Sequence, residues 1–185
     1  DNVSGTVISV PTDSNNYLSG ASATVSPTEP TRTGYIFQGW NDNPGNTGTT
    51  YRTGTANNTY SIASANVTLY AQWTLETYTV TYNVNGGGTP TPSNQTKTYG
   101  VSLTLVNAAP TRANYVFLGW NTTSAGSGDT YTVSSSYTGN TAITLYAQWT
   151  LETYTVTYAG GGGTGSAPSS PNSATFGTTF AVPAN

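Results

Sequence analysis

The chain has 185 residues, a formal net charge of −3, and neither cysteine nor histidine. Only 6% of its residues are charged, against roughly 25% in ordinary globular proteins, and its four cations are scattered. This pattern excludes the clustered positive charge of a nucleic-acid interface and the basic face of a membrane-surface helix. The commonest general base, the thiol nucleophile and the usual transition-metal ligands are missing as well, so we expect no cofactor.

Membrane insertion of this segment is not expected. No apolar run approaches the roughly 20 residues of a membrane-spanning helix. The first residues also lack the charged and apolar regions of a signal peptide, so a secreted protein would carry its targeting segments outside this stretch.

An unchanged duplication organises the chain. The block TLYAQWTLETYTVTY occupies positions 68–82 and again 144–158, an offset of 76. A second pair of segments, PTRTGYIFQGW from Pro30 and PTRANYVFLGW from Pro110, has an offset of 80, so a surface loop has changed length between the two anchors. Repeats of this size fold as successive structural units. We divide the chain into repeat unit 1 (1–74, first strand missing), repeat unit 2 (75–150, complete) and the start of repeat unit 3 (151–185, truncated).

The strands of repeat unit 2 are predicted from the alternation of apolar and polar residues. Tyr78, Val80 and Tyr82 alternate with threonines, which is typical of a half-buried strand. The glycines and prolines that follow mark a loop. A second strand is expected over 96–106, and Gly100 is a point where it can break.

The third strand begins near Tyr115. In it Tyr115 and Phe117 share one face, and Val116 and Leu118 share the other. Apolar residues on both faces predict a central position in the sheet. Gly119 fits a bulge that re-aims the indole after it, because a glycine inside a strand commonly marks one.

The remainder of the unit completes a fold that is mostly β. Residues 121–130 are expected to form a polar loop, 131–133 a short strand, and 143–149 the last long strand. No stretch has convincing helical periodicity, and β-branched and aromatic residues dominate the periodic segments. We therefore predict little or no helix.

An aromatic core explains the spacing of the large side chains. They recur with strand alternation, which a buried core requires and a sugar-stacking platform does not. A sugar platform remains the alternative interpretation. The predicted core consists of Tyr35, Phe37, Trp40, Leu69, Trp73, Tyr78, Val80, Tyr82, Tyr115, Phe117, Trp120, Leu145 and Trp149.

The motifs YTVTY, PTRANYVFLGW and TLYAQW, in a unit of about 76 residues, resemble the Listeria-Bacteroides repeat, also known as the B-repeat of internalins. The most specific matches are Gly34–Trp40 and the Leu-Tyr-Ala-x-Trp segments ending at Trp73 and Trp149. The resemblance implies small β-grasp-like domains in tandem in bacterial surface and secreted proteins, without catalytic residues. Because few residues connect Trp73 to Tyr78, we expect successive units in a fixed, extended arrangement.

The chain departs from the family pattern in two ways. Asn114 stands where the pattern favours glycine, a modest change because asparagine tolerates positive φ. Repeat unit 1 lacks the opening YTVTY strand, whereas residues 151–185 have it and then stop. This complementary truncation has two interpretations: an arbitrary choice of chain ends, or a fibre subunit in which 151–185 of one chain completes repeat unit 1 of the next.

Neither the carboxylates nor the glycine runs favour catalysis. Glu76 and Glu152 occupy equivalent positions of different units, so they cannot converge on one substrate, and we interpret them as linker carboxylates in solvent. The glycine runs at 86–88 and 160–163 lack the spacing, helix and lysine of a phosphate loop. We interpret them as hairpin loops.

Two further candidates are weak from sequence alone. Asp42 with its flanking asparagines, and Asp129 near Asn121, could offer oxygens to calcium, but one carboxylate per loop is a thin ligand set and we predict no metal site. Lys97 is the only lysine, so a lysine–asparagine isopeptide bond could exist in repeat unit 2 alone. We expect instead an exposed, solubilising lysine.

The sequence thus favours a non-enzymatic, extracellular or cell-surface bacterial protein that serves as a stalk, spacer or adhesive segment. Its expected partners are a protein or glycan on another surface, or copies of itself. Two alternatives stay open: a self-assembling extracellular filament subunit, and a carbohydrate-binding module of a secreted protein.

Overall fold

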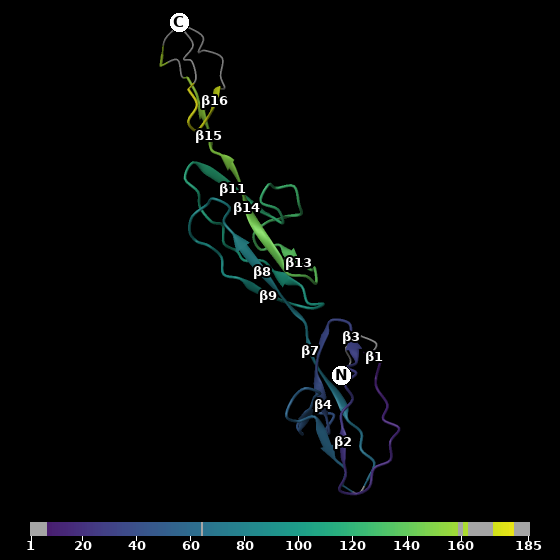
Figure 1. Cartoon of the computed structure of the whole chain (residues 1–185). Coiled ribbons are helices and arrows are strands. Elements are labelled where there is room, and N and C mark those ends of the chain that lie inside the picture. The colour runs from purple at the N-terminus through teal and green to yellow at the C-terminus, as the bar shows by residue number, and fades with distance from the viewer. Residues whose placement is uncertain (1–6, 64, 159–160, 163–171, 180–185) are drawn as a thin grey trace. The chain divides into compact units, whose positions relative to one another are not determined.

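The computed structural model describes residues 7–63, 65–158, 161–162 and 172–179 (Figure 1). These residues form sixteen β-strands, and none of them lies in a helix. The predicted strand-only tandem fold is confirmed, while its β-grasp character stays a prediction. The chain divides into compact unit 1, residues 1–78 with 98–101, and compact unit 2, residues 79–97 with 102–185.

Compact unit 2 is built on a five-stranded sheet. Its strands lie in the order β12 (Thr130–Tyr131), β11 (Tyr115–Asn121), β14 (Ile143–Leu151), β8 (Thr77–Asn83) and β9 (Gln95–Thr98). β11 runs antiparallel to β14, whereas β8 runs parallel to β14, with Ile143 opposite Val80 and Leu145 opposite Tyr82. A separate pair joins β10 (Leu103–Thr104) to β13 (Ser136–Tyr137).

The core of compact unit 2 gathers around the Trp120 indole. Trp120, Val80 and Leu145 have no exposed surface. The Tyr82 ring meets the indole edge to face at 4.9 Å between centroids, and the Phe117 ring does so at 5.3 Å. Such pairs add to the burial of their apolar area. β8, β11 and β14 therefore each contribute to one closed aromatic core.

A β-bulge aims Trp120 into this core, as predicted. The register of β11 against β14 shifts between Phe117 and Gly119. Gly119 has φ 131°, and a Cβ added there would lie 2.9 Å from the Tyr131 carbonyl oxygen. Leu118 is the additional residue. A side chain at position 119 would thus be strained and would clash with the neighbouring strand.

The prediction that β11 is a central strand is confirmed, because it lies between β12 and β14 in the sheet. Val116 is 48% exposed and Leu118 is 57% exposed. Alternating apolar residues on a strand therefore did not require burial on both sides.

The second predicted strand is two strands. β9 ends at Thr98, a turn follows in which Gly100 has φ 68°, and β10 begins at Leu103. The break at Gly100 is confirmed. β13, the partner of β10, had no clear signal, because it contains only two residues.

Compact unit 1 repeats part of this architecture. One sheet has the order β1 (Val7–Ile8), β3 (Thr31–Arg32), β4 (Tyr35–Asn41) and β5 (Thr50–Tyr51), with β7 (Tyr70–Leu75) also paired to β4. A second sheet joins β2 (Ser22–Thr24) to β6 (Thr59–Ser61). The bulge recurs at Gly39, with φ 139°. The buried core is smaller and consists of Val25, Phe37 and Trp40.

The last strands of compact unit 2 form an antiparallel pair. β15 (Thr153–Val156) pairs with β16 (Asn172–Thr175), with Thr153 opposite Thr175. β15 carries the same YTV sequence as β8. Of the predicted glycine loop at 160–163, residues 160 and 163 lie outside the described residues.

Candidate functional site

The duplicated block folds differently in its two copies, and the difference leaves a groove, open among the described residues, on one side of compact unit 1. β14 begins at Ile143, but β7 begins only at Tyr70, which is three positions later in the repeat. The residues lost from the strand, 67–69, are equivalent to three of the four residues of β14 that pair with β8. Among the described residues β7 pairs with β4 alone. The start of the repeated block is therefore a strand only in the copy where a neighbouring strand pairs with it.

Burial changes at the same positions. Leu145 and Ala147 are completely buried in compact unit 2, whereas their equivalents Leu69 and Ala71 are only partly buried. Tyr70, whose equivalent Tyr146 is partly buried, is 40% exposed. The core of compact unit 1 is thus open on the side where β8 closes the core of compact unit 2.

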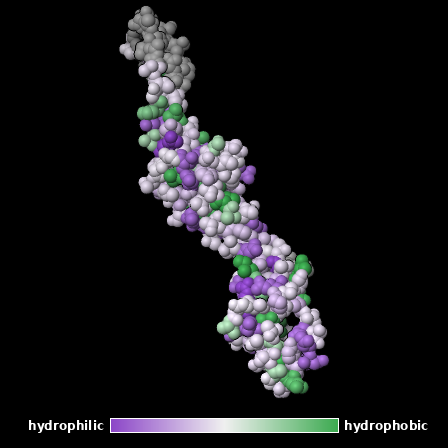
Figure 2. Space-filling model, viewed as in Figure 1, coloured by the Kyte–Doolittle hydropathy of each residue, from purple (hydrophilic) through white to green (hydrophobic). Residues whose placement is uncertain are grey.

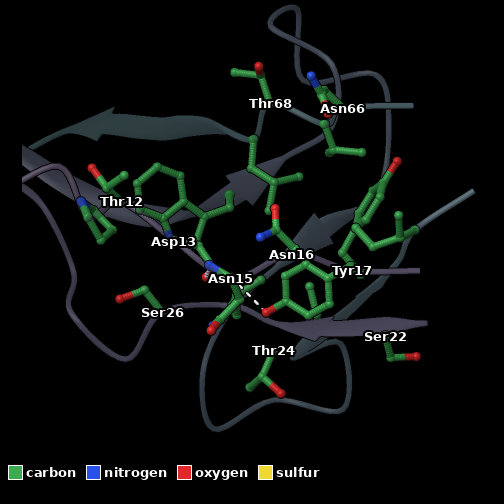
Figure 3. A pocket seen from close by; sticks show the side chains of 18 of the residues that line it. Thr12, Asp13, Asn15, Asn16, Tyr17, Ser22, Thr24, Ser26, Asn66 and Thr68 are labelled. Atoms are coloured by element: carbon green, nitrogen blue, oxygen red, sulfur yellow. Dashed lines mark hydrogen bonds between the residues drawn. The ribbon is translucent and has the colours of Figure 1, made fainter. Parts of the chain in front are cut away.

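A cavity of about 1150 Å³ occupies this side of compact unit 1. Its apolar walls include Trp40, Val67 and Leu69, and its polar walls include Asp13 and Asn16. Figure 3 shows labelled polar side chains such as Asn16 and Thr68 around this space. The volume exceeds the roughly 300–1,000 Å³ of small-molecule pockets. In compact unit 2 the equivalent position beside β14 is occupied by β8.

Asp13 accepts hydrogen bonds from two neighbouring residues of the polar wall. Its carboxylate accepts hydrogen bonds from the Asn15 backbone N–H at 2.9 Å and from the Tyr17 hydroxyl at 2.8 Å (Figure 3). The Asn15 N–H first, and then the Tyr17 hydroxyl, lower the pKa of Asp13. The carboxylate is fixed by its own loop, so we assign it a structural role in this wall.

A second repeated arrangement centres on the glutamate after the last long strand. In compact unit 2 the Glu152 N–H donates to the Asn114 carbonyl at 2.9 Å, and the Glu152 carbonyl accepts from the Phe176 N–H at 3.0 Å. The Tyr154 hydroxyl donates to the Glu152 carboxylate. Asn114 has φ 66°, as expected of a residue that replaces glycine. The side chain and both backbone groups of Glu152 are thus engaged.

Compact unit 1 contains the same arrangement. The Glu76 N–H donates to the Gly34 carbonyl, and the Glu76 carbonyl accepts from the Tyr99 N–H, both at 2.9 Å. The Tyr78 hydroxyl donates to Glu76 Oε2 at 2.5 Å. The interpretation of Glu76 and Glu152 as free carboxylates in solvent is wrong: both are partly buried, because a tyrosine two residues later covers each one.

The asparagines of the two loops that were weighed as weak calcium candidates brace those loops. Asn121 is 1% exposed, and its Oδ1 accepts from the backbone N–H groups of Thr123 and Gly128. Asn41 is fully buried and accepts from the Asn43 N–H. The described residues contain no group of three acidic, histidine or cysteine side chains that could hold a metal.

Lys97 contradicts the expectation of an exposed lysine. Its side chain in β9 has no exposed surface, and Nζ donates to Asn140 Oδ1 at 3.1 Å. Strand alternation carried this signal, because the equivalent positions in the other repeats hold Tyr17 and Ala174. The position therefore faces inward, and only the usual preference of lysine for solvent argued otherwise.

The predicted core residues lie inside the two units to different extents. None of the thirteen is exposed, which leaves no bare sugar-stacking platform among them. Phe37, Trp40, Val80, Tyr82, Trp120 and Leu145 are buried, and Tyr35, Leu69, Trp73, Tyr78, Tyr115, Phe117 and Trp149 are partly buried.

The Listeria-Bacteroides repeat domain model matches residues 2–72 and 78–148. The chain belongs to this family. These two matches correspond to the two copies of the Gly-Trp bulge and of the long strand that pairs with it.

Longer bacterial proteins contain similar sequences. A Gly-rich membrane protein of Evansella cellulosilytica is 34% identical over 136 residues, which cover 71% of this chain and 16% of that protein. Internalin H of Listeria monocytogenes is 36% identical over 126 residues, which cover 67% of this chain and 21% of that protein. The chain thus spans about a fifth or less of the length of these relatives. No solved structure matches it.

The open groove predicts that the same Leu→Ala substitution lowers the stability of compact unit 1 less than that of compact unit 2. Leu145→Ala removes a fully buried side chain and should destabilise compact unit 2 by about 2–5 kcal/mol. Leu69→Ala removes a side chain that already borders the cavity, and it should cost compact unit 1 only about 1 kcal/mol. Native-state hydrogen exchange of β11 and β4 amides in dilute protein would measure each unit separately. Equal costs would contradict an open groove.

The Tyr78–Glu76 hydrogen bond predicts that the Tyr78 hydroxyl loses its proton at a higher pH than an ordinary tyrosine. This bond raises the pKa of Tyr78 to about 12. Because the folded-state pKa lies above the unfolded value, the stabilisation is present below pH 10 and is lost as the pH rises towards about 12. The difference in phenolate absorbance between the wild type and Tyr78→Phe should show this titration, and Glu76→Gln should lower its midpoint. A Tyr78 midpoint near 10 in the wild type would refute the hydrogen bond.

Proposed function

We propose that the chain is a non-enzymatic segment of an extracellular or cell-surface bacterial protein, and that it acts as a stalk or spacer. The observation that carries this proposal is the double backbone hydrogen bonding of Glu76 and Glu152, which ties down the short connection that follows each long strand. The names of the relatives, a membrane protein and an internalin, support a location at the surface.

The mechanism is geometric. A spacer keeps the parts that it joins at a set distance only if the connections between its repeats resist local unfolding. In each compact unit the glutamate has both backbone groups engaged and its carboxylate covered by a tyrosine, so opening there breaks three hydrogen bonds together. Four residues separate Trp73 from Tyr78, which leaves little slack in the chain.

The surface suits a passive segment. Figure 2 shows large areas of intermediate hydropathy with small strongly polar and strongly apolar areas between them. Hydroxyl and amide side chains supply this surface, since only 6% of the residues are charged. Such a surface has little long-range electrostatic attraction, so any adhesive contact with a protein or glycan would depend on short-range shape and hydrogen bonds.

The spacer proposal predicts how a surface protein that carries these repeats responds to their replacement. Replacing residues 1–185 with unrelated β-repeats of the same length should preserve attachment to a partner, because the length of the segment matters and its surface does not. Deleting the segment should reduce attachment, as measured by adhesion of bacteria that display equal amounts of each variant. Loss of adhesion in the equal-length replacement would identify an adhesive surface and contradict the spacer.

Hydrogen exchange tests the structural basis of the same proposal. The backbone amides of Glu76, Tyr99, Glu152 and Phe176 should exchange as slowly as those of the neighbouring strands. Exchange of these four amides at the rate of an unstructured peptide would contradict the claim that hydrogen bonds hold this connection in place. This result would count against the claim independently of the adhesion assay.

A second candidate, self-assembly by strand addition, is favoured by the open groove of compact unit 1. β15 offers the matching element, because it has the sequence of β8 and pairs on one side with β16. Val156 and Tyr158 are only partly buried, whereas their equivalents in β8, Val80 and Tyr82, are buried. Groove and strand are thus complementary halves of one repeat.

The register follows from compact unit 2. There Val80 lies opposite Ile143 and Tyr82 lies opposite Leu145 in parallel pairing. By equivalence, Val156 of one copy would lie opposite Val67 of another, and the Tyr158 ring would lie beside Trp40. A contact of this head-to-tail kind does not close on itself, so it generates fibres.

Self-assembly predicts that residues 1–185 form concentration-dependent oligomers in light scattering. Val156→Lys should abolish them, because it places an ammonium group in the apolar groove, whereas the matched control Thr155→Lys, on the exposed face, should not. Fusing a TYTVTYN strand ahead of Asp1 should also abolish them by filling the groove within each chain. A monomeric wild type at high concentration would exclude this candidate.

A further inference from the structure

The contact between Lys97 and Asn140 joins two distant parts of compact unit 2. Lys97 lies in β9, and Asn140 lies in the segment between β13 and β14, 43 positions later. Lys97 is fully buried, whereas Asn140 is at the surface, and its amide oxygen lies 3.1 Å from Nζ. The asparagine side chain therefore reaches inward to the amino group.

A lysine at this position is unexpected in energetic terms. The equivalent residues of the other repeats are Tyr17 and Ala174, so the fold does not require a charge here. Burial of a lysine amino group is costly unless the group is hydrogen-bonded. The free amine form of a lysine is a nucleophile, and Nζ of Lys97 donates a hydrogen bond to the Asn140 carboxamide oxygen.

We propose that Lys97 and Asn140 become joined by an intramolecular isopeptide bond. The uncharged Nζ attacks Asn140 Cγ, and the bond from Cγ to Nδ2 breaks. One proton passes from Nζ to the departing Nδ2, which leaves as ammonia. The product is a secondary amide between the two side chains, and the reaction needs no oxidant or cofactor. The Nζ–H hydrogen bond to Oδ1 holds the amine against the carboxamide.

The bond would close a covalent loop around part of compact unit 2. The loop from Lys97 to Asn140 contains β10, β11, β12 and β13, including the Trp120 bulge. A cross-link that closes a long loop lowers the entropy of the unfolded chain. It would also replace the buried amino group by a neutral secondary amide. Repeats with Tyr17 or Ala174 at this position cannot form it.

Intact-mass spectrometry of the purified 185-residue chain tests the proposal directly. The expected mass is the sequence mass less one ammonia, with a peptide map that contains a branched peptide linking Lys97 to Asn140 and no tryptic cleavage after Lys97. Asn140→Ala and Lys97→Arg should each restore the sequence mass of the variant. Asn94→Ala, at an exposed position of the same loop region, should leave the ammonia loss intact.

Asn85–Gly86 supplies the necessary chemical control. An asparagine before glycine can also lose ammonia by cyclising onto its own backbone, and the mass alone does not distinguish that product. Asn85→Ala should therefore keep the mass deficit if the isopeptide bond causes it. Unmodified mass in the folded wild type, cleavage after Lys97, or a deficit abolished by Asn85→Ala would each overturn the proposal.

Discussion

The parallel pairing of β8 with β14 is the contact on which a complete repeat depends. It places Val80 and Tyr82 beside Leu145 and closes the core over the Trp120 indole. Where the described structure lacks this partner, in compact unit 1, an identical sequence loses three residues of strand and the core opens into a cavity. One strand thus decides whether the aromatic core is closed, since backbone pairing and side-chain burial are gained together.

The bulge before each core indole shows what local sequence can specify. Gly119 and Gly39 interrupt an apolar alternation directly before tryptophan, and both have positive φ at a shift of register. The chemistry is local, because a Cβ would clash with the neighbouring strand. The positions of the strands, the turn at Gly100 and the low helix content could be predicted from the sequence for the same reason.

Long-range partners could not be inferred in this way. The residues of β8 and β14 that pair are 63 positions apart, as with Val80 and Ile143, and alternation does not specify which strand a given strand joins or in which direction. Burial of Lys97 escaped prediction because the usual preference of lysine for solvent was given more weight than the strand alternation that places it inward. Exposure of Val116 and Leu118 depends on what covers the sheet, which a strand pattern does not encode.

Hydrogen bonds take over roles that ion pairs play in more charged proteins. Asn41 and Asn121 are buried and brace equivalent loops, and Glu76 and Glu152 are each tied through backbone and side chain. Such fully satisfied buried polar groups fix a unique geometry. Together with the aromatic cores, these hydrogen bonds fix the conformation of this weakly charged repeat. They support the proposed role as a spacer.

Titration of the chain with a synthetic peptide of residues 77–83 while its NMR spectrum is recorded is the most direct test of the claim that a β8-type strand closes each core. We predict changes concentrated at Val67, Leu69 and the Trp40 indole, with strand-like amide protection appearing over 67–69, and no change at the filled site around Trp120. Absence of binding at saturating peptide, or changes spread evenly over both compact units, would contradict it.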